Sequence, residues 1–199
     1  MQENITDEGR KQIIEKAKAE GMSAAAFMLF TMLLPYASDF FPQLQNKSGG
    51  PTTALVVITL MYFYRALKKL QPLCRARLIL FFTLYWTSSI AVAIFFVLAT
   101  VYEAEQYMFI LFVIGLFVSL VFCMVCWMIL NFKLAKITQK PLFKIYALCF
   151  VASVISSIAI VALGATKHDA IYYVDTAFSV ITGALLIVAW HSIDKIEEL

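Results

Sequence analysis

Small and polar side chains recur on one face of the last apolar segment of this sequence. They are Asp175, Ser179, Thr182 and Gly183. Spacings of one, three and four residues place such a set on one side of a helix. A carboxylate inside an apolar helix is costly, so Asp175 is the leading candidate for binding a cation, carrying a proton or pairing with a polar partner. The alternative is that Asp175 lies nearer the end of the segment and is simply hydrated.

Asp39 is a second carboxylate that could contribute to this candidate site. It lies near the end of the first apolar segment, and the expected topology puts it on the same side of the membrane as Asp175. Two carboxylates would suit a cation, because hard cations prefer oxygen ligands. The alternative places Asp39 in the head-group layer, since Pro42 follows it closely and ends the segment.

Other small residues indicate where helices pack against one another. Lipid gives helices no hydrophobic reason to associate, so close contacts in membranes are marked by small and weakly polar side chains. Residues of this kind occur at helical spacing, and they are Gly115 with Ser119, Ser153 with Ser157, and Gly183. The sequence favours helix packing at these faces over a lining for permeating solutes, which stays the alternative.

No group of residues in the sequence has the spacing of a catalytic, metal or cofactor site. Cys123 and Cys126 are spaced as in a zinc knuckle, but no second pair of ligands follows. His168 and His191 fall at opposite ends of the last segment, so they cannot share one ion. A glycine-rich phosphate loop is also missing from the sequence. The sequence therefore predicts a protein that is not an enzyme and has no catalytic residues, no metal and no cofactor.

The elements that carry these residues are long apolar segments. Apolar residues make up 62% of the sequence and charged residues 15%, against roughly a quarter in soluble domains. A helix of about 20 apolar residues crosses roughly 30 Å of hydrocarbon. Segments of this kind, the second of them short, cover residues 22–41, 52–64, 78–102, 107–132, 145–164 and 170–192. The sequence thus predicts an all-α fold, a polytopic transmembrane helical bundle of six spans in the lipid bilayer.

We expect three regions along the chain. Residues 1–21 have mixed charges and are expected to form a cytoplasmic amphipathic leader helix, with Thr6 as its N-cap and Gly21 at its end. A solvated leader is the alternative. Residues 22–193 are expected to form the six-helix transmembrane domain, and residues 194–199 a cytoplasmic tail.

Basic residues indicate orientation rather than a nucleic-acid partner. They gather in two linkers, residues 65–77 and 133–144, and basic linkers stay in the cytoplasm. Alternation of basic and non-basic linkers predicts an even number of spans with both the N and C termini in the cytoplasm. The compactness of the chain favours a bacterial inner membrane over a eukaryotic membrane.

The sequence also matches itself at a fixed shift. Moving the chain by 68 positions aligns Gln71 with Gln139 and residues 88–91 with residues 156–159. The match predicts repeated helical hairpins in parallel orientation. Because apolar sequences resemble one another readily, a chance match is the alternative.

Two functions from different classes are consistent with these observations. The favoured one is a non-enzymatic accessory or interaction subunit of a membrane complex, because short linkers leave most recognition surface within the bilayer. Its partner would be another membrane protein or a second copy of this chain, as a homo-oligomer. The alternative is a transporter or channel for small solutes, cations or protons, centred on Asp175.

Overall fold

The described part of the chain is helical throughout. A computed structural model describes residues 6–40, 49–163 and 170–197, and within these helices it describes only the backbone of residues 35–40, 49–51, 161–163 and 170–172. The elements in order are α1 (Asp7–Phe40), α2 (Gly49–Leu70), the 3-10 turn η2 (Gln71–Leu73), α3 (Leu78–Val101), α4 (Gln106–Thr138), α5 (Leu142–Leu163) and α6 (Ala170–His191). Each predicted apolar segment corresponds to one of these helices, so the all-α prediction is confirmed for the described residues.

Five of the helices are long and apolar enough to cross a membrane, namely α1, α3, α4, α5 and α6. The exception is α2, because three basic residues, Arg65, Lys68 and Lys69, occupy its last turns. Its apolar stretch is correspondingly short. The described residues therefore have the helices of a membrane protein, but the predicted count of six spans is not confirmed.

The predicted leader and the predicted first span are one continuous helix, α1. Thr6 caps it as predicted, since its Oγ1 atom accepts a hydrogen bond from the Gly9 amide at 3.2 Å. The prediction that Gly21 ends a helix is wrong, because this residue lies inside α1. A Cβ atom at Gly21 would lie 2.1 Å from the Trp190 ring of α6. Here glycine permits close packing of α1 against α6 and does not end a helix.

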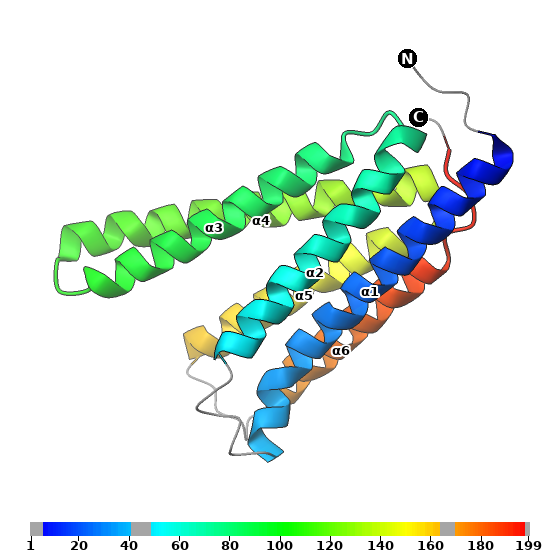
Figure 1. The fold of residues 1–199 in the computed structure, drawn as a ribbon. Helices are drawn as coiled ribbons and strands as arrows, with labels where there is room; N and C mark the ends of the chain where they lie inside the picture. The colour runs from blue at the N-terminus through cyan, green and yellow to red at the C-terminus, as the bar shows by residue number, and fades with distance from the viewer. Residues whose placement is uncertain (1–5, 41–48, 164–169, 198–199) are drawn as a thin grey trace.

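Consecutive helices pack as three hairpins, α1 with α2, α3 with α4 and α5 with α6, and α1 also packs along α6. In Figure 1 the first and third hairpins lie side by side as a four-helix bundle, whereas the α3–α4 hairpin points away from them. The hairpin meets the bundle mainly through α4 and α5. Successive hairpins agree with a repeated architecture, although the internal repeat itself is not confirmed.

Buried aromatic rings join the three hairpins near one end of the molecule. The Phe63 ring of α2 lies 5.1 Å from Trp127 of α4 and 5.7 Å from Trp190 of α6, centroid to centroid. Phe63 also stacks on Phe82 of α3, and Trp190 meets Phe143 of α5 edge-on. Such pairs contribute about 0.5–1.5 kcal/mol each beyond the area that they bury. We call these five residues the aromatic cluster.

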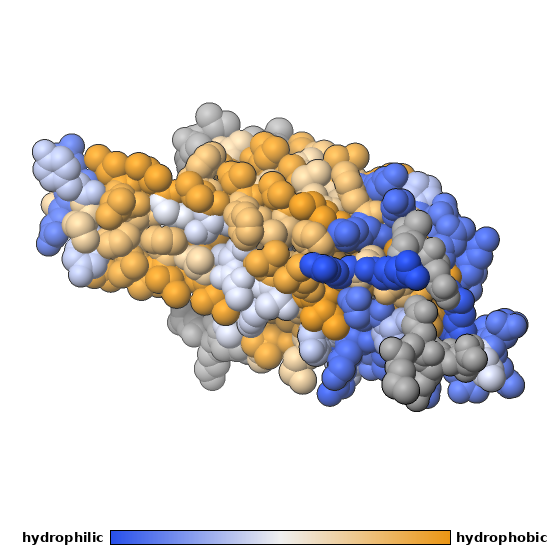
Figure 2. All heavy atoms as spheres, turned by 90° about the horizontal axis from the view of Figure 1, so that it is seen from above, coloured by the Kyte–Doolittle hydropathy of each residue, from blue (hydrophilic) through white to orange (hydrophobic). Residues whose placement is uncertain are grey.

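The surface between the two hydrophilic ends of the molecule is apolar. Figure 2 shows a broad apolar region that separates a large hydrophilic end from a smaller hydrophilic tip. On α4, Tyr107 is 89% exposed and Phe117 is 66% exposed. Large apolar side chains at such exposure are favourable in contact with lipid tails or with another protein, and unfavourable in contact with water.

We predict that Gly21→Leu weakens the packing of α1 on α6. The new side chain would collide with the buried Trp190 ring, and overpacking of this kind costs about 1–3 kcal/mol. Ala26→Leu, on the exposed side of α1, is the matched control and should leave stability unchanged. The midpoint of thermal unfolding in mild detergent measures both variants. An unchanged midpoint for Gly21→Leu would contradict the close contact.

Candidate functional site

The predicted site residues of α6 meet predicted packing residues of α5 along one polar seam. The Ser157 hydroxyl donates a hydrogen bond to Asp175 Oδ1 at 2.9 Å. The hydroxyl oxygens of Ser153 and Ser179 lie 3.4 Å apart, and both residues are buried. The structure thus brings together two sets of residues that the sequence presents separately. We call these four residues and Thr182 the polar seam.

Thr182 lies at the buried end of the seam. Its side chain has no exposed area, and its Oγ1 atom has no hydrogen-bond partner among the described residues. A buried hydroxyl without a partner costs about 1–3 kcal/mol. A water molecule or ligand atom that reached Thr182 would therefore gain a hydrogen bond there.

The predicted packing residues Gly183 and Gly115 both lie at close helix contacts. A Cβ atom at Gly183 would lie 2.6 Å from Leu29 of α1, and one at Gly115 would lie 2.7 Å from the Phe95 ring of α3. Ser119, one turn further along α4, is partly buried. The side chain of Asp39 lies outside the described residues, so its approach to Asp175 stays a prediction.

The seam offers only oxygen atoms to a ligand. Asp175 is partly buried and contributes the single carboxylate, while serine and threonine contribute hydroxyls. Among the described residues, His, Cys, Asp and Glu side chains form no group of three or more that could hold a metal ion. One carboxylate with hydroxyl neighbours can bind a proton or a weakly held cation, or it can pair with a donor on another helix.

An apolar cavity lies where the α3–α4 hairpin leaves the bundle. Its volume is about 320 Å³, and its lining includes Met28, Phe63, Tyr85, Trp86 and Trp127. Such a lining suits an apolar group rather than a charged solute. Sequence reasoning missed the cavity because its walls come from five helices, and spacing within one helix cannot show how five helices converge.

Two buried polar side chains near the aromatic cluster, Tyr146 and Asn131, were also not identified from the sequence. Tyr146 is fully buried, and its hydroxyl accepts a hydrogen bond from Trp127 Nε1 at 3.1 Å and lies 3.8 Å from Met28 Sδ. Asn131 is fully buried as well, and its Oδ1 atom has no partner among the described residues. A single asparagine near the end of an apolar run is a sequence signal that could have revealed the second of these.

Residues 192–197 form a C-terminal strap across the hydrophilic end of the helices. Ile196 is buried, and the Glu197 amide donates a hydrogen bond to the Ile137 carbonyl of α4 at 2.8 Å. Arg10 of α1 donates a hydrogen bond from Nη2 to the Ile196 carbonyl at 2.7 Å. The described part of the predicted tail is therefore packed against the ends of α1 and α4.

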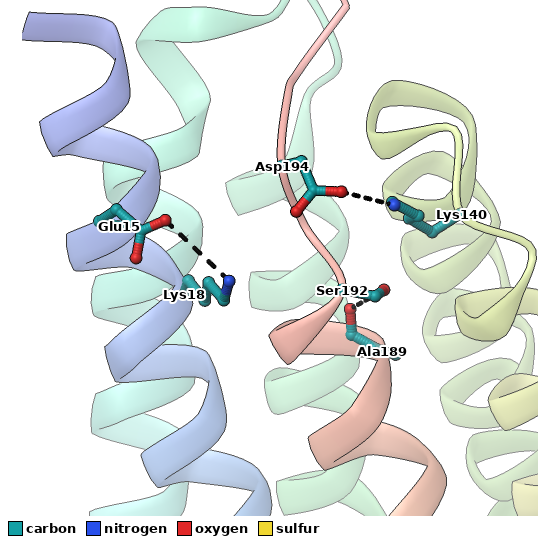
Figure 3. Close-up of polar contacts among 6 residues, drawn as sticks. All are labelled: Glu15, Lys18, Lys140, Ala189, Ser192 and Asp194. Atoms are coloured by element: carbon teal, nitrogen blue, oxygen red, sulfur yellow. Dashed lines mark hydrogen bonds and ion pairs between the residues drawn. The ribbon is translucent and has the colours of Figure 1, made fainter. Parts of the chain in front are cut away.

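An exposed ion pair also holds the strap. Lys140 donates a hydrogen bond to Asp194 Oδ2 at 2.8 Å (Figure 3). This hydrogen bond and the charge of Lys140 lower the pKa of Asp194 below its ordinary value of 3.8. Because the folded-state pKa is lowered, the pair stabilises the docked strap above pH 3.8, and this contribution is lost as the pH falls through the lowered pKa.

We predict that Asp194→Asn loosens the strap at neutral pH. Hydrogen exchange at the Glu197 amide, corrected for its intrinsic rate, should be faster than in the unsubstituted protein, because the charged contact to Lys140 is lost. The variant should also lack the acceleration that the unsubstituted protein shows as Asp194 becomes protonated. Glu15→Gln, which removes a nearby carboxylate that pairs with Lys18 instead, is the control. Equal exchange in all three proteins would refute the role of this pair.

Comparisons with known proteins do not supply a function. No family model matches the sequence, and neither a curated protein nor a solved structure matches the chain. The function is therefore inferred from the arrangement of the hairpins, the polar seam and the hydrophilic end.

Proposed function

We propose that this chain is an integral membrane protein that acts without catalysis, as an accessory or interaction subunit of a membrane complex. The observation that carries the proposal is the divergence of the α3–α4 hairpin from the bundle (Figure 1). Because of this divergence, no other helix among the described residues packs against the outer part of the α3–α4 hairpin. A partner helix, from another membrane protein or from a second copy, would have such a surface to pack against.

The side chains on the exposed face of α4 have the spacing that helix packing requires. Ile110, Ile114, Phe117 and Val121 are each between 43% and 66% exposed. They recur every three or four residues, and such rows form the ridges that fit the grooves of another helix.

Hydroxyl groups in the helices mostly bond to their own backbone. Thr31, Thr59 and Thr83 each donate a hydrogen bond to the carbonyl four residues earlier, at 2.8–2.9 Å. The hydrogen atoms of these hydroxyls are thus satisfied within their own helices and need no other polar partner. Such local bonding is expected of polar side chains that serve helix packing in an interaction subunit.

We also propose six spans, with α2 as the short one, and both termini in the cytoplasm of a bacterial inner membrane. Arg75 of the first basic linker and Lys133 at the start of the second line the same pocket. This proximity supports one common side for both linkers, as the distribution of basic residues requires.

A photo-crosslinking amino acid at Phe117 tests the interaction function. We expect a discrete protein adduct in native membranes, because this side chain is 66% exposed on the diverging hairpin. Ile181 of α6, which is 51% exposed on the bundle, is the matched control and should give lipid adducts only. Mass spectrometry of the adducts identifies a second copy or another membrane protein, and either result supports the proposal. Lipid adducts alone at both positions would overturn it.

Transport of a proton or cation is the second candidate function. It is favoured by the hydrogen bond between Ser157 and Asp175 and by the Thr182 hydroxyl on the same seam, which has no partner in the described part of the chain. Asp175 thus supplies a charged acceptor, and the hydroxyl groups of the seam extend from it into the buried part of the α5–α6 contact.

Asp175→Asn tests this second function in proteoliposomes. Transport predicts that most of the proton or cation flux is lost while the helical content is unchanged, because the amide cannot carry the negative charge. Asp175→Glu should retain part of the flux. Glu105→Gln, in the turn between α3 and α4, is the control for general loss of charge. Flux that is equal in the unsubstituted protein, the variants and empty vesicles would exclude transport through the seam.

A further inference from the structure

Three cationic side chains line one pocket at the hydrophilic end of the molecule. The pocket has a volume of about 180 Å³ and is lined by Arg75, Lys133 and Lys136, with Ala76 and Ile137. Arg75 and Ala76 belong to the linker between η2 and α3, whereas the two lysines lie almost one turn apart on α4. No acidic side chain is among the described residues that form its walls.

The linker that carries Arg75 is held in place by Gln71. The Gln71 side chain donates a hydrogen bond from Nε2 to the Ala76 carbonyl at 2.7 Å. Its Oε1 atom accepts hydrogen bonds from the amides of Leu78 and Ile79, at 2.9 and 3.3 Å. One glutamine thus fixes both the bend of the linker and the start of α3. The wall of the pocket is therefore preorganised, which lowers the entropic cost of binding.

The charges of the pocket are not neutralised by the ion pairs that the described residues form. Those ion pairs involve Lys18, Lys69 and Lys140. Lys133 instead lies over the Phe81 ring, with Nζ 5.0 Å from the ring centroid, a contact that orients the ammonium group without cancelling its charge. Like charges that face one pocket repel each other, so an anion between them is favourable.

Phosphate is the anion that fits this combination of donors. Arginine presents a planar fork that binds phosphate oxygens in pairs, and lysines add compact positive charge. Free phosphate and a phospholipid head group offer the same oxygen atoms. The surroundings favour the lipid, because Leu80 lies five residues after Arg75 and Phe132 directly precedes Lys133 in the chain, and these two apolar side chains are 45% and 38% exposed. Acyl chains could lie against these side chains while the phosphate occupies the pocket.

We propose that Arg75, Lys133 and Lys136 form a binding site for the head-group phosphate of an anionic phospholipid. The site lies where the apolar run of α4 gives way to basic residues, which is the depth of lipid phosphates. The inference rests on the proposed membrane location, but it does not depend on the partner of the α3–α4 hairpin.

Native mass spectrometry of the delipidated full-length protein tests the site. Dioleoyl-phosphatidylglycerol and dioleoyl-phosphatidylcholine are titrated separately, and the unsubstituted protein should bind the first lipid more tightly. In Lys133→Gln/Lys136→Gln this preference should fall about tenfold or more, since each basic residue near the surface contributes about 1 kcal/mol to anionic lipid binding. Arg75→Gln should weaken it further.

The control removes the same charge from the same end of the molecule. Lys68→Gln/Lys144→Gln replaces two exposed lysines that do not line the pocket, and the lipid preference should be retained. Thermal unfolding confirms that each variant is folded. Equal losses in the two double variants would overturn the site and indicate general surface charge.

Competition with inorganic phosphate distinguishes a phospholipid head group from free phosphate as the ligand of the pocket. An excess of inorganic phosphate should leave the bound phosphatidylglycerol in place. Displacement of the lipid by inorganic phosphate would overturn the lipid assignment. Flotation separates this inference from the membrane location: a chain that does not float with phosphatidylcholine vesicles refutes the membrane location. A chain that floats with them but shows no preference for phosphatidylglycerol refutes only the pocket.

Discussion

The packing of Phe63 between Trp127 and Trp190 is the interaction on which the arrangement of this chain depends. Helices in lipid gain nothing by hiding apolar area from their surroundings, so specific packing must decide which helices touch. Here the contacts join α2, α4 and α6, one helix from each hairpin. Because the rings gather near the hydrophilic end, the three hairpins meet there, and the α3–α4 hairpin diverges from the other two further along its length (Figure 1).

The rest of the packing depends on residues that lack bulk. Gly21 and Gly183 bring α1 close to α6, and Gly115 brings α4 close to α3. The short serine side chains do the same for α5 and α6, and they also bond across the contact. Close packing and polarity are thus combined in the seam, which is why Asp175 can be read both as a packing residue and as a binding residue.

The length of the apolar runs predicted where the helices lie, although α2 and α4 each extend six residues beyond the predicted ends at 64 and 132. The predicted ends of the segment at 78–102 differ from those of α3 by one residue at most. Gly21 shows where local signals fail, because an indole ring on α6 makes glycine a packing residue inside a helix. The α6 face with Asp175 and Ser179 was recognised from spacing alone, whereas its pairing with Ser153 and Ser157 required the helix contact. The 320 Å³ cavity could not be foreseen, since it exists only where five helices meet.

The α3–α4 hairpin contacts the bundle near one of its ends, so a small change in its tilt moves the opposite end over a larger distance. The 22 residues from Gln106 to Trp127 span about 32 Å along α4, at about 1.5 Å for each step from one residue to the next. A tilt of about 10° at the aromatic cluster would move the free end by roughly 6 Å over that length, while the rings themselves shift little. Bilayer thickness acts on the tilt of such a hairpin, because apolar helices incline to match the hydrocarbon depth. Thinning or thickening of the membrane would therefore open or close the angle that contains the apolar cavity.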